Sequence, residues 1–234
     1  MAIAKSSAAG SGGTTTSGTV SPATVNAGDY MVLSLEMDCH TSGIIQTGTI
    51  TDTNSNSWSL LASIQSTVVG HEQRFELWGA KNPSAVTPTI SVSISGAIVA
   101  WGASCCSFNG VDTTTPIADA ALSNGTFTGV ATDLSINLTT RVANECIVAV
   151  SGTNFSGDGA PPAINVAGYT NSGASISSGS LAASGLWFKI IATPGTNNVD
   201  FGNLSYSAMG VLGLNPIGGV LPAGQKRPVI VITQ

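Results

Sequence analysis

Hydrophobic and polar side chains alternate with a period of two in three separate segments of the chain. The apolar members are Met31, Leu33, Leu35 and Met37 in the first segment, Ile90, Val92 and Ile94 in the second, and Leu134, Ile136 and Leu138 in the third. Strict alternation is typical of a β-strand with one buried face. Weaker apolar runs predict further strands at 59–64, 75–78, 99–108, 146–150, 186–191, 199–201 and 206–214. We therefore expect an all-β protein.

The connections between these segments favour a particular kind of β-fold. Turn residues such as Asn82-Pro83 and Asn109-Gly110 separate the apolar runs, and no window sustains the stripe of an amphipathic helix. About eight to ten short antiparallel strands predict a sandwich or a barrel, because a lone sheet leaves its apolar face exposed. The connections vary widely in length, with an expected exposed loop at 156–185. This variation favours an antiparallel β-sandwich, jelly-roll or Ig-like.

The two ends of the chain differ in composition from the body. Residues 8–18 are rich in Gly, Ser and Thr without a hydrophobic anchor, so residues 1–18 are expected to form an arm. The body then forms a single sandwich domain over 19–216, and 217–234 form a second arm behind a Gly-rich hinge.

The C-terminal arm carries candidate assembly residues. They are the β-branched run Val229, Ile230, Val231 and Ile232, and the preceding basic pair Lys226 and Arg227. Such a run predicts a strand, either added to the sheet edge of a neighbouring copy or placed at an edge of its own domain. The basic pair is either a contact to an acidic neighbour or ordinary solubilising charge.

Charge is scarce along the whole chain. Only 8% of the residues are charged, 42% are hydrophobic, and the formal net charge is −5. A surface with few ions costs little to bury against a neighbour. The body has no basic stripe with interleaved aromatics, which disfavours nucleic-acid binding. No apolar stretch is long enough to span a membrane, and the first residues lack the apolar core of a secretory signal.

Several short motifs of the body occur in a familiar order. They are Gly28-Asp29-Tyr30-Met31-Val32-Leu33, Thr51-Asp52-Thr53-Asn54-Ser55-Asn56-Ser57-Trp58, Leu77-Trp78-Gly79-Ala80-Lys81-Asn82, and Ser107-Phe108-Asn109-Gly110-Val111-Asp112. Over 19–216 the chain resembles a family of β-sandwich modules found in bacterial extracellular proteins and phage structural proteins. It departs from the family at Ser55, where a turn glycine is usual. The resemblance implies display, adhesion or assembly, with no catalytic motif.

The usual signatures of catalysis and cofactor binding are absent from the sequence. There is no nucleophile elbow, phosphate-binding loop or dinucleotide-binding fingerprint, so we expect no enzyme, no cofactor and no catalytic residue. Only His40 and His71 are histidines, and Cys39-His40 lacks further ligands nearby, so we expect no metal site. The four cysteines are expected to be small core or surface residues. Cys105 and Cys106 should face opposite sides of a strand.

Three groups of polar and aromatic residues each allow two interpretations. Asp52-x-Asn54-x-Asn56 opens like a calcium loop, but a side-chain-capped turn explains it better. Glu72 and Glu76 would suit a glycosidic site, but a solvated outer strand face is favoured. The four tryptophans would form a sugar-stacking platform or, more often for this residue type, core and interface anchors. They are Trp58, Trp78, Trp101 and Trp187.

Two functions remain after these exclusions. The first is a structural protein of a virion or extracellular assembly, such as a capsid decoration, minor capsid, tail or fibre subunit. Its partners would be other copies or neighbouring proteins of the particle, and synthesis in the host cytoplasm would need no signal. The second is a carbohydrate-binding or adhesive module of a secreted bacterial protein, with a host-surface glycan as partner.

Overall fold

The computed structural model of the 234-residue chain describes residues 2–39, 46–66, 72–124, 132–153, 164–173, 176–178, 182–204, 207–219 and 231–232. All regular elements in these ranges are β-strands, so the described chain contains no helix that could cross a membrane. Strand pairs are antiparallel except for one short pair at the C-terminal end. The predicted all-β class is confirmed.

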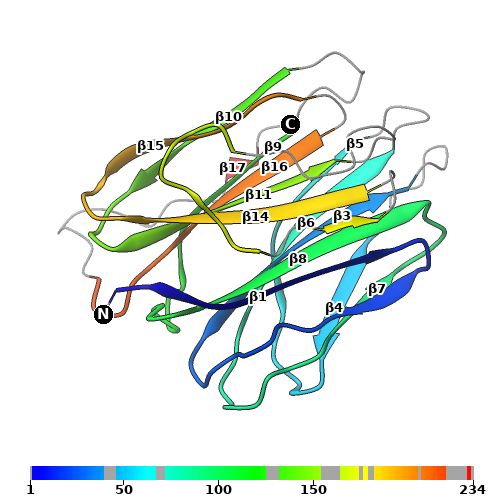
Figure 1. Cartoon of the computed structure of the whole chain (residues 1–234), viewed down its shortest axis with the longest axis horizontal. Coiled ribbons are helices and arrows are strands. Elements are labelled where there is room, and N and C mark those ends of the chain that lie inside the picture. The colour runs from blue at the N-terminus through cyan, green and yellow to red at the C-terminus, as the bar shows by residue number, and fades with distance from the viewer. Residues whose placement is uncertain are drawn as a thin grey trace.

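A five-stranded sheet lies at the centre of the fold (Figure 1). Its strands follow the order β1 (Ala4–Gly13), β8 (Ala100–Asn109), β3 (Tyr30–Asp38), β6 (Gln73–Lys81) and β5 (Ser59–Ser66). A three-stranded sheet covers one of its faces, in the order β2 (Ser17–Val20), β7 (Ile90–Ile94) and β4 (Gly48–Asp52).

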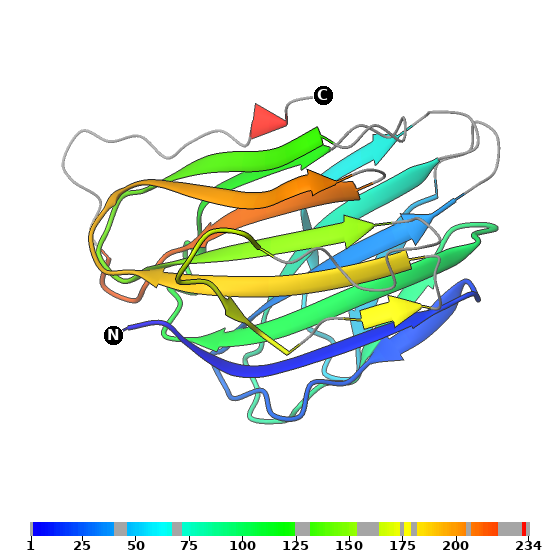
Figure 2. The same ribbon diagram turned by 45° about the horizontal axis from the view of Figure 1, so that its top comes forward.

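A seven-stranded sheet covers the opposite face of the central sheet. Its strands are β12 (Thr170–Asn171), β14 (Ala182–Ile191), β11 (Glu145–Thr153), β16 (Ser207–Leu214), β9 (Ile117–Asn124) and β17 (Val231–Ile232), with β13 (Ile176–Ser178) also beside β14. A two-stranded sheet of β10 (Thr132–Thr140) and β15 (Gly195–Leu204) covers its outer face. Figure 2 shows the same succession of layers from a second direction.

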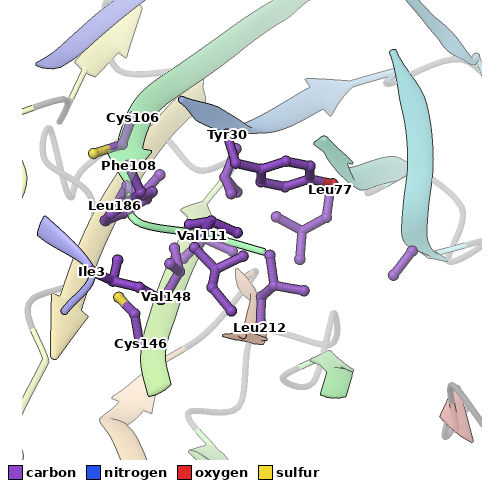
Figure 3. Close-up of a cluster of buried hydrophobic side chains, with 14 of the residues drawn as sticks. Ile3, Tyr30, Leu77, Cys106, Phe108, Val111, Cys146, Val148, Leu186 and Leu212 are labelled. Atoms are coloured by element: carbon purple, nitrogen blue, oxygen red, sulfur yellow. The ribbon is translucent and has the colours of Figure 1, made fainter. Parts of the chain in front are cut away.

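Three hydrophobic cores hold the four layers together. The middle core joins the five- and seven-stranded sheets through side chains such as Tyr30, Phe108, Val148 and Leu212 (Figure 3). A second core, with Met31 and Trp101, lies under the three-stranded sheet, and a third, with Trp187, lies under the two-stranded sheet. The antiparallel β-sandwich is confirmed, and both of its large sheets are covered on their second faces.

The covering sheets explain why the alternation of apolar and polar residues predicts burial correctly in some strands and not in others. In the outer strand β7, Ile90 and Val92 are buried while Ser93 is exposed, as the alternation predicts. The central strand β3, also predicted to be half-buried, is buried at all nine positions. Its polar members Ser34 and Glu36 face the seven-stranded sheet, because they share a face with Val32 of the middle core.

The N-terminal residues differ from the arm that the sequence predicts. Within the expected arm 1–18, Ala4–Gly13 pair with β8 as the edge strand of the central sheet (Figures 1 and 2). Ile3, 3% exposed, inserts into the middle core (Figure 3). The Ser7 hydroxyl is buried and accepts the backbone N–H of Thr24 at 3.1 Å. This tract has little strand propensity of its own. Backbone pairing with β8 and one apolar anchor, Ile3, hold it in the central sheet.

Two further segments bear on the predicted boundaries. The expected loop 156–185 contains the short strands β12 and β13, and its last residues, Ala182–Gly185, are buried within β14. At the C-terminal end, Val231 and Ile232 pair in parallel with Ala121 and Leu122 of the same chain. The interpretation as an edge strand of its own domain therefore fits these two residues. Val229, Ile230, Lys226 and Arg227 lie outside the described residues.

Candidate functional site: the asparagine loop and its tryptophans

The loop that follows β4 is organised around one carboxylate. Asp52 Oδ1 accepts the backbone N–H groups of Asn54 at 2.9 Å and Asn56 at 3.1 Å, and its Oδ2 accepts the Trp58 indole N–H at 2.7 Å. This is the side-chain-capped turn predicted from the sequence. Both oxygens that a calcium ion would need already hold N–H donors, so the turn interpretation is confirmed.

A second side chain, Asn82, holds the same loop from the end of β6. Its side-chain NH₂ group donates to the backbone carbonyls of Asn26 at 3.2 Å and Ser84 at 2.7 Å. Because the NH₂ group is directed at carbonyls, Oδ1 is left as the acceptor, and it receives the Nδ2 groups of Asn56 at 3.1 Å and Asn54 at 3.4 Å. Asp52 and Asn82 together fix the loop from two sides.

The loop borders a hollow of about 290 Å³. The residues that line it are Asn54, Ser55, Asn56, Ser57, Lys81 and Pro83. Ser55 has a φ of 56°, a left-handed conformation in which glycine is favoured. Ser55 thus adopts, with a side chain, a turn conformation that glycine usually supplies. The sequence pattern identified the loop as a turn but carried no signal for the hollow, which needs Lys81 and Pro83 from a distant strand end.

The four tryptophans do not form a common platform. Trp101, 1% exposed, lies in the core under the three-stranded sheet, and its indole N–H donates to the Thr15 carbonyl at 2.9 Å. Trp187, 5% exposed, lies in the core under the two-stranded sheet, edge to face with Phe201 at 5.3 Å between ring centroids. These two are core residues. The interpretation of all four tryptophans as one platform is therefore wrong, because the two covering sheets bury Trp101 and Trp187 on opposite sides of the molecule.

Trp58 and Trp78 are half-buried and share one face of the central sheet. Both pack against the core under the three-stranded sheet, and each indole N–H is held by a carboxylate, Trp58 by Asp52 and Trp78 by Glu76 at 2.9 Å. Leu60, the cross-strand partner of Trp78, is 43% exposed. Two of the four tryptophans, each with its indole N–H held by a carboxylate, therefore remain partly exposed on this face.

The two glutamates considered for glycosidic chemistry are buried, not solvated. Glu72 and Glu76 are at most 1% exposed. Glu76 accepts hydrogen bonds from Arg74 Nε at 2.6 Å, the Gly48 backbone N–H at 3.2 Å and Trp78. The predicted solvated strand face is wrong, because β4 of the three-stranded sheet packs over this part of β6. The Glu76 carboxylate therefore connects β6 of the central sheet to β4 of the three-stranded sheet.

Glu36 is the most unusual polar residue of the described chain. Neither carboxyl oxygen has a hydrogen-bond partner among the described residues, and the side chain is fully buried. It faces Gly152 of β11, where a β carbon would stand 2.6 Å from Glu36 Oε2. Burial, and secondarily the Asp38 charge, raise the pKa of Glu36 well above its usual value. Burial therefore favours the protonated form of Glu36.

The residues considered as metal ligands are not gathered in the described part of the chain. Cys39 and the other three cysteines are all buried. Cys105 faces the core under the three-stranded sheet while Cys106 faces the middle core, as predicted for neighbours in a strand. Within the described ranges no three His, Cys, Asp or Glu side chains form a group suited to a metal ion. His40 and His71 lie outside these ranges.

Neither a protein-family model, a curated protein nor a solved structure matches this chain. The resemblance to sandwich modules of bacterial and phage proteins therefore stays a prediction, and the function is argued from the site and the surface alone.

Proposed function

We propose that this chain is a non-enzymatic structural subunit that packs against other copies or neighbouring proteins in a virion or an extracellular assembly. The observation that supports the proposal is the removal of charge from the surface. Six of the twelve acidic residues are buried. They are Asp29, Glu36, Asp38, Glu72, Glu76 and Glu145. Among the side chains that the structure describes, only Lys5 and Lys81 are both charged and exposed.

A surface of this kind suits extensive contact with neighbours. Burying an ion in an interface requires desolvation or pairing, whereas Ser, Thr and Asn side chains exchange hydrogen bonds with water for hydrogen bonds with a partner at low cost. The outer faces of β7 and β10 present this chemistry through Ser93, Ser135 and Asn137. Such faces support packing that depends little on salt.

The assembly proposal is tested by the molar mass of the full chain, measured by light scattering at low and high salt. We expect a concentration-dependent oligomer that persists at high salt. Ser93→Glu places a charge on the outer face of β7, and Ser135→Glu places one on the outer face of β10. The variant whose face lies at an interface should lower the molar mass of the oligomer. Ser93→Thr and Ser135→Thr serve as matched controls. A monomer at every concentration and salt would remove the support for self-assembly.

A second candidate function, saccharide binding, is favoured by Trp58 and Trp78. Aromatic rings that are partly exposed and held by a hydrogen bond suit stacking against a sugar ring. The test is a glycan-binding screen of the full chain and of the Trp78→Ala variant, with Trp78→Phe as control. Binding that Ala removes and Phe keeps would support this function, and no binding to any glycan would count against it.

A further inference from the structure

We propose that the hollow beside the asparagine loop binds a saccharide that carries a carboxylate, with Ser55, Ser57 and Lys81 as its contacts. This inference rests on the second candidate function and names its ligand class. The three residues converge from two strand ends: the serines belong to the loop after β4, and Lys81 is the last residue of β6.

The hollow is built on a rigid frame. The NH₂ groups of its asparagine side chains are already engaged, since Asn54 donates to the Val86 carbonyl at 2.5 Å and Asn56 donates to Asn82. Asp52 caps the loop backbone from below. A binding loop whose shape is fixed before the ligand arrives loses little conformational entropy on binding. The frame therefore leaves the neighbouring hydroxyl and ammonium groups in place for a ligand.

Ser55 is held in a conformation that disfavours its side chain. Only Ser55 and Asn144 are non-glycine residues with positive φ in the described chain. Asn tolerates the left-handed region because its side chain bonds to the local backbone, whereas Ser gains less from it. Strained residues gather at functional sites. The Ser55 hydroxyl is exposed in the hollow and makes no hydrogen bond to a described residue, so a ligand contact accounts for a serine at this position.

The free groups in the hollow define the ligand. Ser55 and Ser57 present hydroxyls that donate to and accept from sugar hydroxyls. Lys81 is exposed and has no carboxylate partner among the described residues, so its ammonium suits an anion. Pro83 adds an apolar wall for the C–H face of a ring. Two hydroxyl groups and one ammonium group match a sugar that carries a carboxylate, such as a uronic acid, better than a neutral sugar.

Titration calorimetry of the full chain with a glucuronate disaccharide and the corresponding glucose disaccharide tests the inference. We expect tighter binding of the glucuronate ligand. Lys81→Gln should weaken that binding roughly tenfold, the loss of one charge-assisted hydrogen bond, and remove the preference for the acidic sugar. Lys5→Gln removes the other exposed charge of the described chain and should leave binding unchanged.

The serine is tested by a matched pair of glycine variants. Ser55→Gly should raise the thermal unfolding midpoint and weaken glucuronate binding several-fold, whereas Asn144→Gly should relieve backbone strain without changing binding. Equal binding of both disaccharides would overturn the carboxylate inference and leave saccharide binding standing. Binding of neither would overturn both. Equal weakening by Lys81→Gln and Lys5→Gln, or full binding by Ser55→Gly, would also overturn the proposed contacts.

Discussion

Gly18 of β2 lies flat against the indole ring of Trp101: a β carbon at position 18 would stand 2.3 Å from Cζ2 of that ring. The same indole donates to the Thr15 carbonyl in the turn between β1 and β2. The glycines of the N-terminal tract thus make room for a buried tryptophan. The sequence of this tract is typical of a flexible linker, but in the fold the tract packs around one side chain.

This contact predicts that Gly18→Ala is destabilising. The added methyl group forces either the indole or β2 to move, and overpacking of this kind costs about 1–3 kcal/mol. Urea unfolding of the single variant and of Gly18→Ala in a Trp101→Phe background measures the coupling, because phenylalanine lacks the ring atoms that meet the methyl group. Equal costs in both backgrounds would show that the indole is not the obstacle.

Ile3 should contribute to stability as a core residue. It is buried in the middle core, and truncation of a buried isoleucine to alanine costs about 2–5 kcal/mol. We expect Ile3→Ala to lower the free energy of urea unfolding by an amount in this range. Ala4→Ser, at the exposed neighbouring position, should stay within about 0.5 kcal/mol of the parent protein. If Ile3→Ala had no effect, residues 1–18 would behave as the unanchored arm expected from the sequence.

The buried Glu36 predicts that stability falls as pH rises from acid to neutral. Its pKa is raised in the folded state, so the folded chain retains a proton that the unfolded chain releases above the ordinary glutamate pKa. This group then lowers stability by at most about 1.4 kcal/mol for each pH unit, until the folded pKa is passed. Glu36→Gln should raise stability at neutral pH and change it little near pH 4. Denaturant unfolding across this range measures both effects.

Glu145 provides the contrasting control for this experiment. Its Oε2 accepts the backbone N–H of Arg141 at 2.8 Å, so it has the partner that Glu36 lacks. Glu145→Gln replaces a charged acceptor with a neutral one and should lower stability at neutral pH by about 1 kcal/mol. A stabilising effect of the same size in both variants would show that burial of either glutamate, and not the missing partner of Glu36, sets the pH dependence.

Backbone strain at Ser55 gives a prediction that does not depend on any ligand. Glycine removes the clash of a β carbon in the left-handed region, which amounts to about 1 kcal/mol, partly offset by the greater entropy of glycine in the unfolded chain. We expect Ser55→Gly to raise the free energy of unfolding by a few tenths to about 1 kcal/mol. Asn144→Gly should give a smaller gain, since asparagine tolerates this conformation. Loss of stability in Ser55→Gly would contradict the strain assigned to the loop.

Part of the candidate site could be predicted from the sequence because its cause is local. Asp52 caps residues two and four positions away, and such contacts follow from the order of residues in a turn. The outer strands β7 and β10 were identified for the same reason: each has one solvated face, so its period of two is visible. Asn82 contacts the loop, Lys81 lines the hollow beside it, and Gly48 donates to Glu76. These residues lie far from their partners in the chain, so no local pattern predicts the contacts.

By itself, the sequence determined the all-β class, most of the strands, the capped turn and the scarcity of charge, because alternation, turn chemistry and composition are properties of neighbouring residues. Only the tertiary structure decided that the sandwich carries two covering layers, that residues 4–13 complete the central sheet, and that every glutamate is buried. The physical reason is that burial depends on what covers a face. A polar residue on a strand is solvated beside water and buried beneath another sheet, and its own neighbours in the chain are the same in both cases.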